Sequence, residues 1–174
     1  MAHPPFVTGN ELGGFPAIDV ALVAPLYSQL IRSYCGWHIA PTATETLTLD
    51  GNGSRVLSLP TLYLAEVVSL TVDDVEVDAD DFEWSERGQL RVPGLFPTTW
   101  RSVVVEMTHG YEETPRDVEL VTASAVRRHL VNPDKVAQET AAGYSVSYNE
   151  VLAVTGLTPT ERQWLGAYRL PGRP

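Results

Sequence analysis

The sequence predicts an α+β fold, in which a region of antiparallel strands lies between two segments with helical spacing. Threonine recurs at every second position from Thr42 to Thr48, as it does in a strand with one exposed face. Apolar residues recur at helical spacing before this region, at 26–34, and after it, at 118–126. A β-branched run at Val103–Val105 leads through a polar turn into the second helix, so this joint connects the β part to the α part.

The first helix is expected at 19–35. Its firm part is placed at Ala24–Tyr34, because Pro25 suits the first turn of a helix and breaks a helix that runs through it. The expected apolar face consists of Leu26, Leu30, Ile31 and Tyr34, and the expected polar face consists of Ser28, Gln29 and Arg32.

The second helix is expected at 114–131. Thr114 can cap this helix, Pro115 fits its first position, and Asp117 stands where the acid of a capping box belongs. The expected apolar stripe consists of Val118, Leu120, Val121, Ala125 and Val126. Arg127 and Arg128 fall off this stripe, so we interpret them as solvated residues or as partners of acids.

The region 36–109 has the pattern of several short antiparallel strands joined by hairpins. The expected hairpins join 42–49 to 55–59 across Asp50–Gly53, 62–72 to 75–77 across Asp73–Asp74, and 82–84 to 89–92 across Arg87–Gly88. Together with the strand at Val103, they predict an antiparallel sheet or a small barrel-like sandwich.

The two ends of the chain are expected to form arms. Residues 1–18 are rich in glycine and proline, and we expect them to be ordered only against a partner or against their own domain. In the C-terminal arm, 132–174, residues 138–148 resemble an extended segment. Thr158 and Glu161 form a capping box around a proline at the first helical position, which predicts a terminal helix at 158–170.

The composition limits the classes of function. The chain has 174 residues, with 12 lysines and arginines against 22 aspartates and glutamates, and its net charge is -10. Nucleic-acid binding needs clustered positive charge, so a protein that grips nucleic acid is not expected. The sequence contains no run of about 18 apolar residues, so no membrane partner is expected either. Cys35 is the single cysteine, which excludes an intramolecular disulfide.

Few residues suggest chemistry. The acidic run from Asp73 to Glu83 lacks the glycine and the terminal glutamate of an EF-hand, and its alternation with apolar residues favours a solvated strand face over a calcium site. Cys35 with His38 or His109 could act as a nucleophile and its base, but no supporting motif accompanies them. We therefore assign no catalytic residue, cofactor or metal, and we predict that the protein is not an enzyme.

Three segments, taken together, resemble a known family. They are Ile31–Pro41, which ends in YCGWHIAP, then Trp84–Val92, which reads WSERGQLRV, and Val103–Leu130, which contains THGYEETPRDV. In this order they resemble the head-to-tail connector proteins (head–tail adaptor or head-completion proteins) of tailed bacteriophages, in the version found in phages of actinobacteria. The resemblance extends from Leu22 to Leu170, which is most of the chain.

The resemblance implies a fold and a structural role. The fold is a small helical bundle, here formed by the two helices, with the strands as a β insertion and with extended N- and C-terminal arms. The role is that of a virion protein that forms a homo-oligomeric ring, of about twelve subunits, beneath the portal protein. The ring extends the DNA channel without binding DNA specifically, and it carries the next neck or tail protein, a stopper or a tail terminator. The protein then lies in the neck of the virion and is assembled in the cytoplasm of the host bacterium.

The resemblance also implies contact residues. Aromatic residues in a docked helix commonly carry interface energy, so the terminal arm is expected to bind the portal. The expected portal-binding residues are Arg162, Trp164, Leu165, Tyr168 and Leu170, and the expected contacts with a neighbouring subunit are Tyr144 and Tyr148. An acidic channel wall leaves the DNA duplex free to pass, which gives the negative net charge a function.

Two other functions are open at this point. One is that of another neck or tail-completion protein, such as a stopper or a tail terminator, a class that tends to be dominated by β-structure without paired helices. The other is that of a small hydrolase or metal-dependent enzyme that uses Cys35, His38 and His109.

Overall fold

The protein combines α-helices with antiparallel sheets, which confirms the α+β prediction. The computed structural model describes residues 3–9, 12–14, 16–131, 138–141, 144–147 and 156–171. The chain divides into two compact units. We call them the helical unit, Met1–Cys35 with Thr114–Arg169, and the sheet unit, Gly36–Glu113 with Leu170–Pro174.

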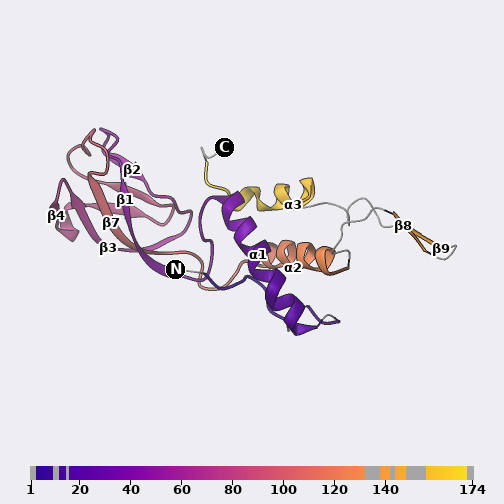
Figure 1. Ribbon diagram of the computed structural model, residues 1–174. Helices are drawn as coiled ribbons and strands as arrows, with labels where there is room; N and C mark the ends of the chain where they lie inside the picture. Colours follow the sequence, from indigo (N-terminus) through magenta and orange to yellow (C-terminus); the bar gives the residue numbers. More distant parts are fainter. Residues whose placement is uncertain are drawn as a thin grey trace. The chain divides into compact units, whose positions relative to one another are not determined.

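The helical unit is built on two long helices that pack against each other, α1 and α2 (Figure 1). A short hairpin, β8–β9, agrees with the extended segment expected at 138–148, and a short helix, α3, continues into the 3₁₀ turn η3. The bounds are α1 Ala17–Cys35, α2 Arg116–Val131, β8 Gln138–Ala141, β9 Tyr144–Ser147, α3 Pro159–Trp164 and η3 Leu165–Tyr168. Among the described residues, no helix has both the length and the apolar content that are needed to cross a bilayer.

Helix α1 agrees with the helix expected at 19–35, but its regular part is longer than the firm part expected at Ala24–Tyr34. It begins at Ala17, so Pro25 lies inside the helix and not in its first turn. A proline inside a helix removes one backbone hydrogen bond. Val20 and Val23, before the proline, and Tyr27, after it, nevertheless belong to one buried cluster with residues of α2. Burial of both halves against the same core therefore outweighs the local cost of the proline.

The buried face of α1 also differs from the expected one. Leu26 and Leu30 are exposed, whereas Ser28 and Arg32 are buried. The N-terminal arm explains the difference, because it packs on this face: the Phe6 amide donates a hydrogen bond to Ser28 Oγ at 2.9 Å, and the Arg32 guanidinium lies 4.1 Å over the Phe6 ring. The described part of the arm thus packs against its own domain.

Helix α2 keeps most of its predicted stripe. Val118, Val121 and Ala125 are buried, but Leu120 is exposed, because it stands only two residues after Val118 and therefore lies on another side of the helix. Arg128, which was expected off the stripe, is buried.

The sheet unit contains two antiparallel sheets, with strand orders β1-β7-β3-β4 and β2-β6-β5. Their inward rows share one apolar core, in which Leu57 and Leu90 of one sheet meet Leu70 and Val105 of the other. The bounds are β1 Ala43–Leu49, β2 Val56–Ser58, β3 Leu64–Val72, β4 Val75–Val77, the 3₁₀ turn η1 Ala79–Asp81, β5 Glu83–Ser85, β6 Gln89–Arg91 and β7 Val103–His109.

Two of the three predicted hairpins are confirmed. Strand β3 pairs with β4, and β5 pairs with β6. The first hairpin is wrong: β1 pairs with β7 along its whole length, and β2 pairs with β6. The turn after β1 does not close a hairpin because its backbone bonds a distant loop, with Gly51 N donating to Thr99 O and Gly53 N to Pro97 O, each at 3.0 Å.

Candidate functional site

The terminal helix starts with the capping box that the sequence predicted. The Glu161 amide donates to Thr158 Oγ1 at 3.2 Å, and the Thr158 amide donates to Glu161 Oε2 at 2.8 Å. The helix has six residues, too few to be stable by itself in water. Its position therefore depends on contacts with the rest of the helical unit.

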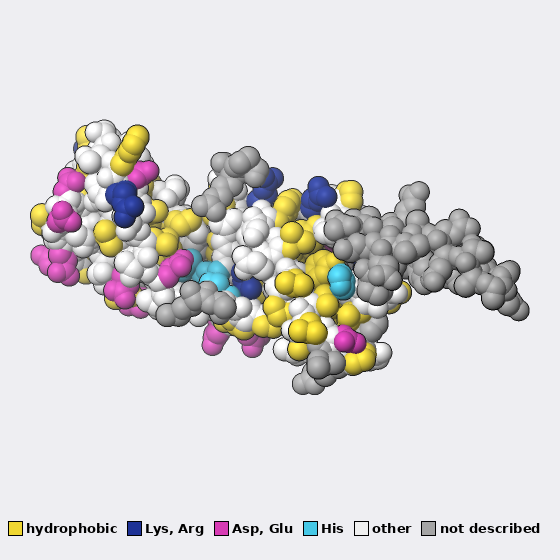
Figure 2. Space-filling view, in the orientation of Figure 1, with side chains coloured by type: hydrophobic (Ala, Val, Ile, Leu, Met, Phe, Trp, Pro, Cys, Tyr) yellow, Lys and Arg dark blue, Asp and Glu magenta, His cyan; other side chains and the backbone are white. Residues whose placement is uncertain are grey.

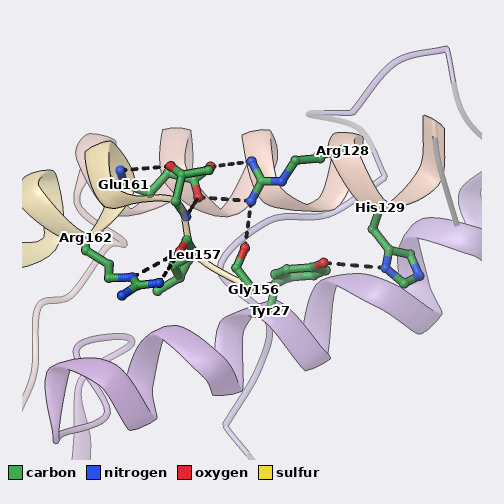
Figure 3. Close-up of polar contacts among 8 residues, drawn as sticks. Tyr27, Arg128, His129, Gly156, Leu157, Glu161 and Arg162 are labelled. Atoms are coloured by element: carbon green, nitrogen blue, oxygen red, sulfur yellow. Dashed lines mark hydrogen bonds and ion pairs between the residues drawn. The ribbon is translucent and has the colours of Figure 1, made fainter. Parts of the chain in front are cut away.

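A buried ion pair supplies the main polar contact between α3 and α2. Arg128 donates to both carboxylate oxygens of Glu161, at 2.7 and 3.0 Å, and to the carbonyl oxygen of Gly156 at 2.8 Å (Figure 3). Both side chains are buried. Burial raises the pKa of Glu161, but the hydrogen bonds from Arg128 and Thr158 outweigh burial, so the net pKa lies below the ordinary value. A carboxylate and a guanidinium that are this well matched fix where the terminal helix docks.

The predicted portal-binding residues fall into two groups. Trp164 is 48% exposed and Arg162 is exposed, while Tyr168 is half-buried. Leu165 and Leu170 are buried within their own chain, so in this structure they offer no side chain to a partner. Their assignment as portal contacts stays a prediction, and it would require these side chains to become exposed when the arm binds.

The side chains that hold α3 in place also belong to this predicted group. Arg162 donates from Nε and from an Nη to the carbonyl oxygen of Leu157, at 3.1 and 2.9 Å (Figure 3). The Tyr168 hydroxyl donates to Asp117 Oδ2 at 3.4 Å. Among the expected contacts, Trp164 is therefore the large apolar side chain that remains available at the surface.

The residues expected at a subunit contact, Tyr144 and Tyr148, are not tested by the structure. Tyr144 begins β9, but its side chain lies outside what the structure describes, and Tyr148 lies outside the described residues. Their assignment stays a prediction.

An exposed apolar row on α1 was missed by the sequence analysis. Leu22 and Leu26 are 67% and 66% exposed, and Leu30 is also exposed. Because these residues are spaced by four, they lie on one side of the helix. The sequence signal was present, but it was interpreted as the core face. Yellow apolar side chains also crowd the helical part of the visible surface in Figure 2.

The acidic run of the sheet unit is solvated, as expected. All of its acidic side chains, namely Asp73, Asp74, Glu76, Asp78, Asp80, Asp81 and Glu83, are exposed. Figure 2 shows acidic side chains distributed over the visible face of the sheet unit.

The two most specific sequence segments, YCGWHIAP and THGYEETPRDV, meet in the sheet unit. The Tyr111 amide donates to the Ile39 carbonyl oxygen at 2.8 Å, and the Trp37 and Tyr111 rings lie 5.9 Å apart. The rings of His38 and His109 are in edge-to-face contact, with centroids 4.2 Å apart. His109 Nε2 lies 2.6 Å from Glu45 Oε1, a residue that the sequence analysis did not single out. His109 thus contacts a carboxylate of β1.

Cys35 does not have the properties of a nucleophile. It is fully buried at the end of α1, and burial raises the pKa of its thiol to about 12. The thiol is therefore protonated at neutral pH, and a protonated thiol is a poor nucleophile.

The comparison with protein families decides the class. Residues 19–170 match the family model described as "HCP: Head completion protein". The chain belongs to the head completion protein family. This confirms the resemblance to head-to-tail connector proteins, and with it the structural function in the neck of the virion. No curated protein matches the chain.

Two solved structures are similar to the chain. One is described as the neck of an empty GTA particle computed with C6 symmetry; it is 18% identical, with 92% of this chain and 84% of that chain covered and a TM-score of 0.51. The other is described as the neck of a native GTA particle computed with C12 symmetry; it is 18% identical, with both chains fully covered and a TM-score of 0.49. At this identity the first structure establishes a shared fold.

Proposed function

We propose that this connector forms a homo-oligomeric ring beneath the portal protein, extends the DNA channel, and carries the next neck or tail protein. The match to the head completion family over 19–170 carries this proposal. A neck joins two symmetric parts of a particle, and a closed ring is the arrangement that a single chain adopts there. The similar neck structure computed with C6 symmetry is compatible with a ring of about twelve subunits.

The paired helices favour a connector over a stopper or a tail terminator. Those classes tend to be dominated by β-structure, whereas here α1 and α2 pack against each other and share a buried apolar cluster. The helices are the part of the chain that we propose as the ring-forming core, and the strands of the sheet unit are the insertion.

The apolar row of α1 is the surface that we propose for contact with a second copy of the chain. In a ring, each subunit presents one side to its neighbour, and a row of exposed leucines buries apolar area there. Tyr144 and Tyr148 are proposed to add to the same contact. Replacement of Leu26 by glutamate is expected to leave the chain folded and to prevent ring formation, as measured by light scattering after size-exclusion chromatography.

The terminal arm is proposed to bind the portal through Trp164, with Arg162 and Tyr168 at its side. Trp164→Ala is expected to weaken capture of the chain by immobilised portal at least tenfold. The reason is that a tryptophan that becomes buried in an interface commonly acts as a hot spot of binding energy. Trp100→Ala is the matched control, since Trp100 is 82% exposed and belongs to the sheet unit. Equal capture of both variants would show that Trp164 does not anchor the chain to the portal.

The acidic surface is proposed to keep the DNA mobile in the channel. With a net charge of -10 on each subunit, the ring repels the phosphates of DNA and does not hold the duplex. We also propose that the protein acts without catalysis, as a part of the virion neck that is assembled in the cytoplasm of the host bacterium.

Electron microscopy of the purified portal mixed with this protein tests the proposal directly. We expect an added ring, on the axis of the portal, whose symmetry matches that of the portal. A mixture in which the portal gains no density, while the chain is folded by circular dichroism, would exclude direct attachment to the portal.

A further inference from the structure

The apolar core of the sheet unit ends in a polar cluster. Along β7, the residues that face the core are Val103, Val105, Met107 and, last, His109. His109 takes the position where the next apolar residue of this row would stand, and it is 1% exposed. Glu45 continues the inward row of β1 beside it, and His38 comes from the segment just before β1. Three separate stretches of the sheet unit therefore bring a potential ligand to one place.

The ligand atoms of these three side chains converge. His109 Nε2 and Glu45 Oε1 are 2.6 Å apart, and one ligand atom from each of the three residues lies within 4.8 Å of the others. His38 Nε2 lies 3.0 Å from the Pro41 carbonyl oxygen, which helps to fix the orientation of its ring. Gly110 makes room for this ring, because a Cβ at that position would clash with His38.

This donor set has the chemistry of a transition-metal site. Two imidazoles and one carboxylate suit Zn²⁺ and similar divalent ions, whereas Ca²⁺ and Mg²⁺ prefer oxygen ligands alone. Zinc binds such ligands at about 2.0–2.2 Å, so the donors around one tetrahedral ion lie about 3.3 Å apart. The donor separations in the cluster, from 2.6 Å up to 4.8 Å, bracket this value. Small side-chain movements therefore suffice to admit an ion.

We propose that His38, Glu45 and His109 bind one divalent transition-metal ion of the Zn²⁺ type. The ion replaces the direct contact between His109 and Glu45 with a bond to each, and a water molecule completes the coordination. The Glu45 side chain is 41% exposed, so the site is open to solvent on the side from which the ion enters. His38 lies near the start of the sheet unit and His109 near its end, so the ion ties together the segments by which the chain enters and leaves this unit.

The experiment uses the full-length chain after treatment with EDTA and removal of the chelator. Titration with ZnSO₄ in a calorimeter is expected to show one ion bound per chain, and the melting temperature is expected to rise with Zn²⁺ and to fall again when EDTA is added. Co²⁺ in place of Zn²⁺ is expected to give the visible absorption of a four-coordinate ion. An excess of Ca²⁺ or Mg²⁺ is not expected to displace the bound ion.

Two matched variants decide whether the cluster is the site. Glu45→Gln removes a charged ligand from a partly exposed position, so the chain folds, and Zn²⁺ binding is expected to weaken by about 10- to 100-fold or more. Glu106→Gln removes a carboxylate from the opposite face of β7 and is expected to bind Zn²⁺ as the unaltered chain does. Absence of Zn²⁺ binding by the unaltered chain, or equal affinity of all three proteins, would overturn the proposal. Equal weakening by both variants would overturn it as well, because the ion is then held by the acidic surface.

Discussion

Replacement of Glu161 by alanine is expected to release the terminal helix from the helical unit. The substitution leaves the buried guanidinium of Arg128 without its carboxylate, and removing one partner of a buried ion pair costs about 3–5 kcal/mol. Because α3 has only six residues, it does not stay helical once it is undocked. A loss of about 4 kcal/mol shifts the equilibrium between the docked and released arm by roughly 10³-fold, since each 1.4 kcal/mol corresponds to about tenfold.

Amide hydrogen exchange measures this change. Protection of the α3 and η3 amides is expected to fall by roughly 10³-fold in Glu161→Ala, while protection in β7 stays as it is. Thr158→Ala loses only the side-chain cap, which is worth about 1 kcal/mol, so its protection is expected to fall by about fivefold. Thr160→Ala, at an exposed position of the same helix, serves as the control. If Glu161→Ala loses no more protection than Thr158→Ala, the ion pair does not hold the arm.

Three further predictions follow from the same contacts. The folded-state pKa of Glu161 lies below its ordinary value of 4.5, so the ion pair stabilises the docked arm at neutral pH. This contribution is lost as the pH falls from about 4.5 through the folded-state pKa. The methyl NMR signals of buried Leu165 are expected to report this loss, and Glu161→Gln is expected to abolish the pH dependence. Gly110→Ala places a Cβ against the His38 ring at a φ of 95°, so a lower melting temperature, by roughly 5 °C or more, is expected, whereas Gly94→Ala, with nothing within 4 Å of a Cβ, is expected to be neutral. Leu70→Ala is expected to lower the free energy of unfolding by about 2–5 kcal/mol, and the same change at exposed Leu95 by less than about 0.5 kcal/mol, as measured by urea denaturation.

Local signals in the sequence were the ones that predicted structure correctly. The capping box at Thr158 and Glu161 depends on atoms three residues apart, so the sequence contains all that it needs. The turn at Asp73–Asp74 is similar: both residues adopt a positive φ, at 49° and 63°, and aspartate tolerates this conformation better than most residues, so the chain turns back immediately and β4 pairs with β3.

Errors arose where the same local pattern fits two partners. The threonine alternation predicted the strand Ala43–Leu49 correctly, but not its neighbour, because strand pairing depends on which distant segment supplies matching hydrogen bonds. The apolar spacing of α1 likewise allowed two faces, and the N-terminal arm around Phe6 decided between them by burying Ser28 and Arg32.

The sequence by itself determined the class of the protein: its α+β composition, the order of most of its elements, and the segments that identify a head completion protein. Only the tertiary structure decided which polar side chains meet. Arg128 and Glu161 are 33 residues apart, and Glu45 and His109 are 64 residues apart. Sequence periodicity indicates which residues share a face of one element, but not which residues of distant elements meet. A buried charge is stable only where the fold brings its partner close, so these pairs depend on the tertiary structure. The docked terminal arm and the cluster of His38, Glu45 and His109 could therefore be identified only from the folded structure.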